Sequence, residues 1–511
     1  FFKNERGRLL PAKLPQISAP TRRDQAGIVG WLQGTNRSLL MSFSNYEDAE
    51  TNGPSVIAFE PGSSAISSTL PAGASSTGAL ALGDADPDGD LDLFVAGRII
   101  AARYPEAASS TYLRNDDGSF LADGAINELF KEIGMVSAAI WSDLNADGRP
   151  ELVLAIEGGP VRVFTFERGR FRELTRELGL EQFAGWWQSV STGDFNNDGR
   201  LDIVAGNLGR NSKYERFIAN GYHLYYGDFE GDGRMQLIEA VRDEESGQIV
   251  PMMDRDSIAM GLPDLRERYP TFASFSSAGV AEILGSRASK ARAMRVNMSE
   301  SMLFLNEGTR FRAQPLPLQA QFAPVFGLAV GDVDGDGNED LAVTQNLFSV
   351  GKRTSRYDAG EGLLLLGDGL GGLEPVPARV SGIKMEAEGR AAAFCDYDHD
   401  GRLDLVAAQS SAQTKLYRNK AGKRGLRILL KGSALNPHGI GAQVRLRFAD
   451  GSAGPVHEVR AGEGYWSQAS NTIVLGKARD VEAVEILWPG GERERVGLPE
   501  GAMEFTLKKR N

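Results

Sequence analysis

The chain has 511 residues and a formal net charge of −12, with 41% hydrophobic and 24% charged residues. This length allows two or more domains, and the composition is that of a globular protein and not of a disordered chain. No apolar run approaches the roughly 20 residues of a membrane-spanning helix. The single cysteine, Cys395, excludes an intramolecular disulfide and is expected to be a small buried strand residue. The chain starts with Phe-Phe-Lys-Asn-Glu, which we interpret as a processed N-terminus.

Short strands are expected along most of the chain, beginning after an N-terminal extension of residues 1–24. The apolar segments 27–32 and 39–43 predict a first sheet that carries no acidic loop. The 61 glycines imply many tight turns, which is typical of an all-β protein. We therefore expect an all-β fold over residues 25–420.

One pattern recurs six times: a small residue, a nine-residue acidic loop, and a short strand rich in leucine and β-branched residues. Many copies continue into a hairpin such as residues 112–120, so each repeat predicts an antiparallel sheet of about four strands. Such sheets form the blades of a β-propeller, which stack around an axis to bury both faces. Six loop-bearing blades and the loop-free N-terminal sheet predict a seven-bladed propeller. The loops are residues 84–92, 143–151, 194–202, 228–236, 332–340 and 396–404.

The wide spacing between the fourth and fifth loops predicts a partly helical insertion at residues 241–300. Its clearest helix is expected to start at Ser277 as N-cap and to stop at Gly285. Beyond residue 420, segments 426–430, 444–448 and 484–488 alternate as strands do. Residues 421–511 are therefore expected to form a small β-sandwich or barrel-like domain.

The acidic loops have the side-chain spacing of a calcium site. Oxygen ligands stand at positions one, three, five and nine, a glycine at position six allows a sharp turn, and the position-seven carbonyl can point inward. Calcium takes six to eight oxygen ligands, whereas magnesium prefers fewer protein ligands and strict octahedral geometry. The candidate metal ligands, with position seven contributing its carbonyl, are Asp84, Asp86, Asp88, Asp90, Asp92, Asp143, Asn145, Asp147, Arg149, Glu151, Asp194, Asn196, Asp198, Arg200, Asp202, Asp228, Glu230, Asp232, Arg234, Asp332, Asp334, Asp336, Asn338, Asp340, Asp396, Asp398, Asp400, Arg402 and Asp404.

Part of this pattern also occurs in EF-hands and in turns that bind no ion. An EF-hand is excluded because position twelve lacks glutamate, as at Val95, and because strands and not helices follow the loops. Turns held by Asx hydrogen bonds without an ion remain the alternative. We expect several calcium ions, up to six, with the fourth loop weak or empty because it ends in Gln236.

The acidic residues of these loops carry more negative charge than the net −12 of the whole chain, so the remaining residues together carry a net positive charge. The acidity thus belongs to the predicted metal sites and does not form a field for basic partners. No basic stripe interleaved with aromatic residues is found, which excludes a nucleic-acid-binding protein of the usual kind.

These loops resemble the FG-GAP/VCBS repeat, which also builds the integrin α-subunit propeller, over residues 25–420. Residues 439–444, 458–468 and 484–491 resemble an ASPIC/UnbV domain. Together they are similar to the cartilage-acidic-protein-like family of secreted proteins. The resemblance implies a seven-bladed propeller, calcium in the loops and an extracellular, periplasmic or cell-surface location, but no common activity. The EGF-like module of some relatives is absent, as the single cysteine requires.

Few residues indicate catalysis. The four histidines show no metal spacing and accompany no nucleophile motif. Gly462, Gly464, Tyr465 and Gln468 form either a docking surface or, as we favour, turns and an aromatic that fix the C-terminal domain to the propeller. Loops 207–214 and 352–358 are rich in polar groups and are placed at one mouth of the propeller, with ordinary inter-blade ion pairs as the alternative. The candidate ligand-binding residues in them are Asn207, Arg210, Asn211, Arg356, Tyr357 and Asp358.

Two classes of function remain. The first is a secreted binding, adhesion or scaffolding protein for a protein or glycan partner, and it is favoured by the lack of a paired histidine or nucleophile. The second is an enzyme, a lyase, dehydratase or natural-product cyclase, with its site in the propeller mouth. Propellers host both, so the fold does not decide between them.

Overall fold

The computed structural model describes residues 2–5, 7–12, 21–34, 36–61, 65–351 and 354–510. Nearly all of its regular structure is antiparallel sheet, which confirms the predicted all-β class. Among these residues, no helix has both the length and the apolar character needed to cross a membrane.

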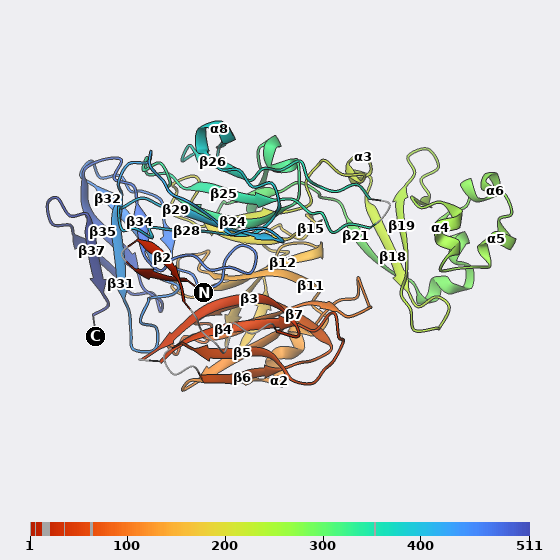
Figure 1. The fold of residues 1–511 in the computed structure, drawn as a ribbon, viewed down its shortest axis with the longest axis horizontal. Coiled ribbons are helices and arrows are strands. Elements are labelled where there is room, and N and C mark those ends of the chain that lie inside the picture. The colour runs from red at the N-terminus through yellow and green to blue at the C-terminus, as the bar shows by residue number, and fades with distance from the viewer. Residues whose placement is uncertain are drawn as a thin grey trace.

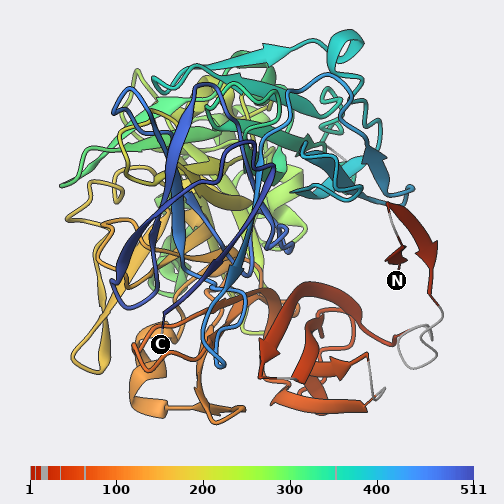
Figure 2. The same cartoon turned by 90° about the vertical axis from the view of Figure 1, so that its left-hand side faces the viewer.

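Six antiparallel sheets, called blades 1 to 6 in chain order, are arranged around a common axis (Figures 1 and 2). From the axis outward, blade 1 contains β3 (Asp24–Gln33), β4 (Asn36–Ser44), β5 (Pro54–Glu60) and β6 (Ala65–Pro71), and blade 2 contains β7 (Ser75–Gly83), β8 (Asp92–Ile100), β9 (Thr111–Asp116) and β10 (Ser119–Ala122). Blade 3 contains β11 (Met135–Ser142), β12 (Glu151–Gly159), β13 (Arg162–Glu167) and β14 (Arg170–Glu173), with β15 (Gly185–Trp186) also paired to β12, and blade 4 contains β16 (Ser189–Gly193), β17 (Asp202–Gly206), β22 (Met302–Asn306) and β23 (Phe311–Pro315). Blade 5 contains β24 (Val325–Gly331), β25 (Asp340–Gln345), β26 (Leu363–Gly367) and β27 (Leu373–Val376), and blade 6 contains β28 (Glu388–Cys395), β29 (Asp404–Ser410) and β30 (Lys415–Tyr417). Short helices α2 (Gly124–Asn127), η1 (Glu128–Phe130), η3 (Leu318–Gln321) and α8 (Ala378–Ser381) lie between blades.

The second strand of a blade is apolar on both faces because a neighbouring blade covers each side. In β12, Leu152, Val153, Leu154 and Ala155 are all fully buried, although successive side chains point to opposite faces. Alternate residues of this strand enter two different clusters, one shared with blade 2 and one with blade 4. Continuous apolar runs in the sequence are therefore the mark of blade stacking here.

The predicted insertion is larger than residues 241–300 and contains a sheet of its own. It lies between β17 and β22 and projects from the ring at the right of Figure 1. Its twelve-residue core cluster is centred on Ile238, Leu265 and Ile283. We call residues 222–296 the inserted module. Its elements are β18 (Tyr222–Gly227), β19 (Gln236–Arg242), β20 (Ile249–Pro251), α4 (Arg255–Ala259), α5 (Leu265–Arg268), α6 (Phe272–Ser276), α7 (Val280–Leu284), η2 (Gly285–Lys290) and β21 (Arg292–Val296), and it follows α3 (Glu215–Ile218).

Two expectations about this region need correction. The fourth acidic loop, residues 228–236, joins β18 to β19 in the inserted module and does not belong to a blade. The described ring therefore has six sheets, and the predicted number of seven is not confirmed. The predicted N-cap Ser277 instead ends α6, while Gly279 caps α7 and donates its main-chain N–H to Glu282 (3.2 Å).

The C-terminal domain consists of two facing sheets, at the left of Figure 1. Leu426 and Ile428 of one sheet and Val444 and Ile486 of the other share a buried core. The strand orders are β34-β31-β37 and β33-β32-β35-β36, with β31 (Leu426–Lys431), β32 (Gln443–Phe448), β33 (His457–Glu458), β34 (Ile473–Leu475), β35 (Val481–Leu487), β36 (Arg493–Gly497) and β37 (Glu504–Lys508).

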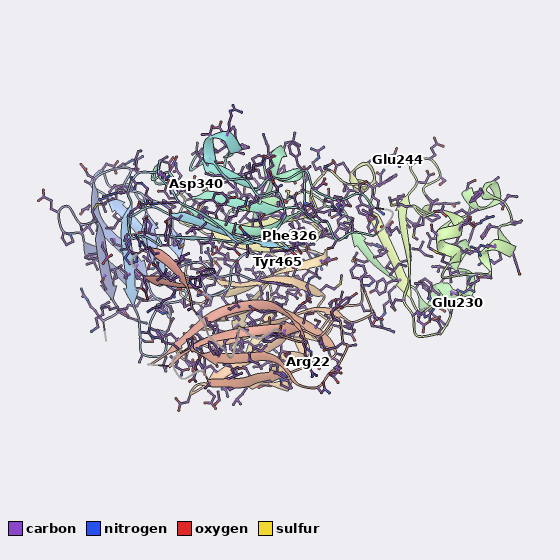
Figure 3. All side chains as sticks on the ribbon, in the orientation of Figure 1. Arg22, Glu230, Glu244, Phe326, Asp340 and Tyr465 are labelled. Carbon is purple, nitrogen blue, oxygen red and sulfur yellow. The ribbon has the colours of Figure 1, made fainter. Side chains whose placement is uncertain are left out.

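A segment of this domain, residues 456–468, enters the axis of the ring, and we call it the axial segment. In Figure 3 its Tyr465 lies beside Phe326 of β24 at the centre of the molecule, with ring centroids 5.2 Å apart. The Ala461 carbonyl accepts a hydrogen bond from Leu82 N of blade 2 (2.8 Å), and the Gly464 N–H donates to Val190 O of blade 4 (3.1 Å). The axis is therefore filled by protein.

The same segment reaches the remaining blades. Trp466 Nε1 donates to Ser137 O of blade 3 (2.9 Å), and Ser467 Oγ donates to Ala392 O of blade 6 (3.4 Å). Gln468 Oε1 accepts from Gly30 N of blade 1 (2.7 Å). One continuous segment thus contacts the innermost strand of every blade.

A substitution at Gly462 would test how closely the axial segment packs against blade 2. Its φ is 105°, and a Cβ there would lie 2.5 Å from Leu80 O, whereas Gly451 has a φ of 86° with open space around it. Both alanine variants incur the same kind of backbone strain, but only Gly462→Ala also forces the segment away from blade 2. We expect Gly462→Ala to lower the melting temperature by clearly more than Gly451→Ala. Equal shifts in thermal denaturation would contradict a tightly fitted axis.

Candidate metal centres

Five of the six acidic loops are wound around the carboxylate of their first residue. In loop 143–151, the main-chain N–H groups of Asp147 and Gly148 donate to Asp143 (3.1 and 2.7 Å). Gly148 has a φ of 86°, which only glycine adopts without strain. The corresponding pair of bonds is present in the loops that begin at Asp194, Asp228, Asp332 and Asp396.

Positions three and five are held in the same local way. The N–H of residue five donates to the position-three side chain, as in Asp336 N to Asp334 Oδ1 (3.0 Å). The N–H of residue seven donates to residue five, as in Asn338 N to Asp336 Oδ1 (2.8 Å). One oxygen of Asp334 and one oxygen of Asp336 are fixed in this way, and Asp336 Oδ2 also accepts from Asn338 Nδ2 (3.0 Å).

The acid at position nine has a role that its predicted ligation did not include. Asp340 is fully buried and accepts hydrogen bonds from Val333 N at the start of the loop (2.8 Å) and from Gly367 N of the third strand (2.9 Å). Asp92 and Asp202 make the equivalent pairs of bonds. We call this residue the clamp, because it ties the loop to its own blade.

Loop 84–92 contains buried carboxylate oxygens that have no hydrogen-bond partner. They are Oδ1 of Asp84, of Asp86 and of Asp90, and the residues Asp84 and Asp90 are only 8% and 5% exposed. Burial, and then the charge of Asp88, raises the pKa of Asp84 and of Asp90 to about 7. The side chain of Asp90 thus joins a cluster to which only its carbonyl was assigned.

Three of the six loops gather acids closely enough to share one ion. The carboxylate oxygens of Asp84, Asp86 and Asp88 lie within 4.8 Å of one another, as do those of two other triplets. No ion is present. The other triplets are Asp332, Asp334 and Asp336, and Asp396, Asp398 and Asp404.

Arginines neutralise part of the acidity in other loops. Arg402 pairs with Asp400 (2.9 Å) and Arg418 with Asp398 (2.6 Å) in loop 396–404. Arg200 pairs with Asp198 in loop 194–202, so the side chain of this position-seven residue faces an acid while its carbonyl stays free. Arg149 lies 3.6 Å from Asp147 in the same relation. Because these ion pairs compensate part of the carboxylate charge, a bound cation is less necessary in these loops than in loop 84–92.

The fourth loop differs from the others. Main-chain hydrogen bonds, led by that of Gly233, lower the pKa of Asp228, and Glu230 pairs with Arg287 (2.8 Å). Gln236 acts as the clamp by accepting from Phe229 N (2.7 Å). The loop is therefore held as a turn with its charges already compensated. In Figure 3, Glu230 lies on the inserted module, far from Asp340.

The C-terminal domain covers the loop-bearing end of the ring and contacts the acidic loops themselves, in addition to the predicted attachment through residues 462–468. Val456 N donates to Asp194 Oδ2 (3.0 Å), and Gln443 Nε2 donates to Asp143 O (2.6 Å). Arg427 pairs with Asp396 (2.6 Å). The buried loops are therefore enclosed between the blades and this domain.

The axial segment carries its own buried charges. Arg460 pairs with Glu463 (2.6 Å) and donates to Thr192 Oγ1 (3.0 Å). Glu458 accepts from Ser142 Oγ (2.6 Å) and from Asp143 N (2.8 Å), and burial raises its pKa to about 7. These contacts favour the structural interpretation of Gly462, Gly464, Tyr465 and Gln468 over a docking surface.

The residues proposed for a ligand at the propeller mouth make ordinary structural contacts. Asn207 is fully buried and accepts from Trp186 N (3.0 Å), while Arg210 pairs with Glu215 (2.6 Å). Asn211 Nδ2 donates to Phe322 O (3.1 Å). Tyr357 is buried and pairs through its backbone with Leu347, Arg356 stacks on the Phe348 ring at 5.7 Å, and Asp358 is exposed. Residues 352 and 353 of this loop lie outside the described residues.

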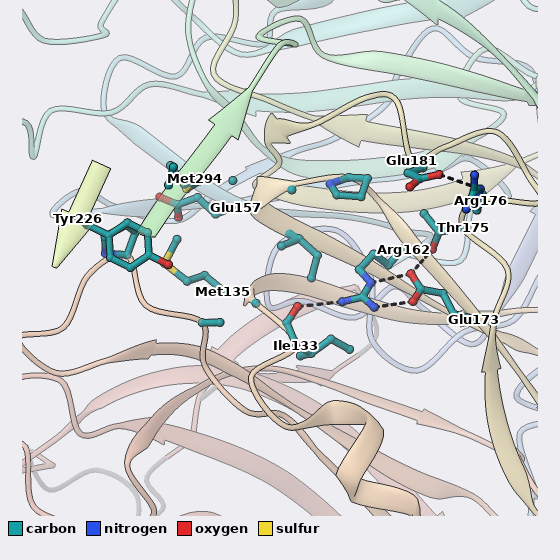
Figure 4. A pocket seen from close by; sticks show the side chains of 18 residues that line it. Ile133, Met135, Glu157, Arg162, Glu173, Thr175, Arg176, Glu181, Tyr226 and Met294 are labelled. Carbon is teal, nitrogen blue, oxygen red and sulfur yellow. Dashed lines mark hydrogen bonds and ion pairs between the residues drawn. The ribbon is translucent and has the colours of Figure 1, made fainter. Parts of the chain in front are cut away.

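A cavity of about 600 Å³ lies between blade 3 and the inserted module (Figure 4). Its charged side chains are paired: Arg162 binds Glu173 (2.6 Å) and Ile133 O (3.0 Å). Glu157 at its edge binds Arg98 and the Tyr104 hydroxyl. The cavity is lined by no histidine and no cysteine, so the enzyme alternative stays a prediction without a catalytic group assigned to it.

Comparison with known families assigns two parts of the chain. Residues 143–205 match the FG-GAP-like repeat, and residues 432–511 match the ASPIC and UnbV domain. Both identifications confirm the resemblance found in the sequence. A search of curated proteins finds no match.

Two of the solved structures that this chain resembles are only remotely similar to it. A Bacillus licheniformis rhamnogalacturonan lyase is 14% identical over 79% of this chain and 72% of its own, with a TM-score of 0.26. The extracellular domain of a putative hybrid two-component system from B. thetaiotaomicron is 11% identical over 81% of this chain, with a TM-score of 0.22. This chain covers only 47% of the latter structure. At these TM-scores neither similarity bears on the function of the chain.

Mutation can distinguish the contribution of the clamp to stability from that of the metal ligands. Asp340→Ala leaves two main-chain N–H groups of the blade unpaired, at a cost of about 1–3 kcal/mol each where they are buried. We therefore expect Asp340→Ala to destabilise the protein even in a chelator, measured by urea denaturation. Asp336→Ala should cost much less in the chelator, because its bonds lie within a partly exposed turn. Similar losses in both variants would contradict the distinction.

Proposed function

We propose that this chain is a calcium-loaded β-propeller that acts outside the cytoplasm as a binding scaffold for a protein partner. The observation that carries the calcium assignment is the set of unpartnered oxygens in loop 84–92. Three carboxylate oxygens are buried there without a donor. Buried anions without partners are costly, so a bound cation accounts for their arrangement.

The donor set fits calcium better than other common metals. The loops offer carboxylate, amide and main-chain oxygens and no sulfur, and calcium accepts such ligands in flexible geometry. The residues best placed to hold it are Asp84, Asp86, Asp88 and Asp90, followed by Asp332, Asp334 and Asp336. Bound calcium would neutralise the clustered charge and cross-link the two inner strands of a blade. Loop 228–236 is proposed to hold none.

The location follows from the proposed affinity. Calcium loops of extracellular modules bind at roughly 10⁻⁴–10⁻³ M, which exceeds cytosolic calcium and suits an extracellular or periplasmic supply. The scaffold role is supported by the inserted module, which projects from the ring (Figure 1) and exposes Met260 (73%) and Phe272 (60%). Because these two side chains lie on the projecting element, we assign them to the contact with a protein partner.

Calcium removal tests the first half of the proposal. A chelator should lower the melting temperature, and calcium should restore it, by about 1.4 kcal/mol for each site at ten times its Kd. Asp88→Asn should reduce this calcium response, whereas Asp232→Asn, at the same position of loop 228–236, should leave it unchanged. A response that is absent, or that both variants reduce equally, would refute the assignment of the sites.

Partner capture tests the second half. The purified chain, mixed with an envelope fraction and cross-linked, should retain a protein that the double variant Met260→Asp/Phe272→Asp loses at unchanged melting temperature. Leu370→Asp is the matched control, because Leu370 is 80% exposed on blade 5. Equal capture by all three proteins would show that the inserted module is not the binding surface.

A further inference from the structure

The N-terminal hairpin, β1 (Phe2–Glu5) with β2 (Arg8–Pro11), has the form of the outer hairpin of a blade. Asn4 pairs with Leu9 and Glu5 with Arg8, and the outer hairpin of blade 2 has the same register, with Asn115 opposite Phe120. In both hairpins a glycine three residues after the asparagine donates to its side chain. The distances are 3.0 Å for Gly7 and 2.9 Å for Gly118, and φ is 78° and 91°.

The asparagine of an outer hairpin also bonds to the preceding blade. Asn306 Nδ2 of blade 4 donates to Leu144 O (2.9 Å), the second residue of the acidic loop of blade 3. Asn419, which follows the third and last described strand of blade 6, donates through Nδ2 to Val333 O (2.7 Å), the second loop residue of blade 5. Asn4 Nδ2 donates to Tyr397 O (2.7 Å), the second loop residue of blade 6. The hairpin β1–β2 therefore stands where a blade after blade 6 would place its outer strands.

The inner half of such a blade is missing from the described residues. The Asn306 and Asn419 N–H groups each donate to the clamp of their own blade (2.7 Å in both), and β1 pairs with no strand other than β2 in the described chain. Phe2 is 62% exposed, whereas Phe304, two residues before Asn306, is fully buried. The apolar side chains of the hairpin thus lack the sheet that covers their counterparts.

A cleft of about 810 Å³ lies where those inner strands belong. It is bounded by β3 of blade 1 and by β28 and β29 of blade 6, and residues 465–468 of the axial segment form its floor. Strands β3 and β28 keep half-buried or exposed positions along their length, whereas β11, β16 and β24 are buried throughout. In Figure 2 the hairpin lies between the red strands of blade 1 and the blue-green strands of blade 6.

We propose that this cleft receives a two-stranded β-hairpin with a seventh nine-residue acidic loop, joined to the N-terminal end of β1. In blades 2, 3 and 5 the chain runs from the two inner strands directly into the outer hairpin, and this order identifies the source of the occupant. The ninth loop residue would be an acid that accepts a hydrogen bond from Asn4 N. The completed blade would cover Phe2 and close the ring between blades 6 and 1. This proposal is independent of the partner and of calcium occupancy.

The test adds the missing strands to the full chain. A copy of residues 325–345, which contains two inner strands and their loop, is fused ahead of Phe2 through a short Gly-Ser linker. We expect a higher melting temperature and at least tenfold slower amide hydrogen exchange in β3 and β28. The matched control is the same fusion with Asp340→Ala in the added copy only, which removes the acceptor for Asn4 N and should lose most of the gain.

Three results would overturn the proposal. The first is unchanged exchange in β3 and β28 on fusion, and the second is equal protection by the fusion and its control. The third is dimerisation of the fused chain with protection only in the dimer, which would place the occupant in a second molecule. Asn4→Ala in the fused chain removes the bond to Tyr397. It is expected to reduce the gain in melting temperature below that of the fusion with Asn4 intact.

Discussion

The ring depends on the axial segment that fills its centre. Innermost strands of a propeller converge on an axis where their main-chain groups and small side chains would otherwise face an open channel. Residues 456–468 supply hydrogen bonds and ring contacts to all six blades. Since blades 1 and 6 are separated by a cleft, this segment also connects the two ends of the ring. The C-terminal domain is thus part of the propeller core and not an appendage.

The acidic loops serve the fold before they serve any ion. In five loops the first carboxylate accepts hydrogen bonds from main-chain N–H groups of the turn, and in loops 84–92, 194–202 and 332–340 the clamp joins the loop to the third strand of its blade. Arginines balance the charge in some loops, and the C-terminal domain shields several of them from water. The loops differ in how much negative charge is left without a partner. This charge is largest in loop 84–92, where Asp84, Asp86 and Asp90 each have a carboxylate oxygen without a hydrogen-bond partner. The proposed calcium occupancy follows that residual charge and not the presence of the motif alone.

Local features were predictable from the sequence, whereas long-range ones were not. The turn geometry of the loops depends on residues within nine positions of one another, so spacing alone identified it. The same motif could not tell which sheet a loop joins, and loop 228–236 was therefore assigned to a blade although its strands belong to the inserted module. Asn207 was a ligand candidate because it is polar, but its polarity satisfies Trp186 N in the interior. The burial of Glu458, Arg460 and Glu463 could not be predicted, because their hydroxyl partners Ser142, Thr192 and Ser191 in β11 and β16 lie more than 250 residues away in sequence. Gly462, Gly464 and Tyr465 were the available signal for the axial segment.

The origin of the axial segment near the C-terminus has a consequence for how the molecule assembles. During synthesis the blades are made first, and the residues that complete their common centre are made some 40 residues after the last blade strand. Blades can fold one by one as sheets, but the buried polar groups along the axis gain their partners only when this late segment arrives. Ring completion therefore waits until all six blades have been synthesised, and a chain cut after blade 6 would retain sheets around a hydrated centre without this support.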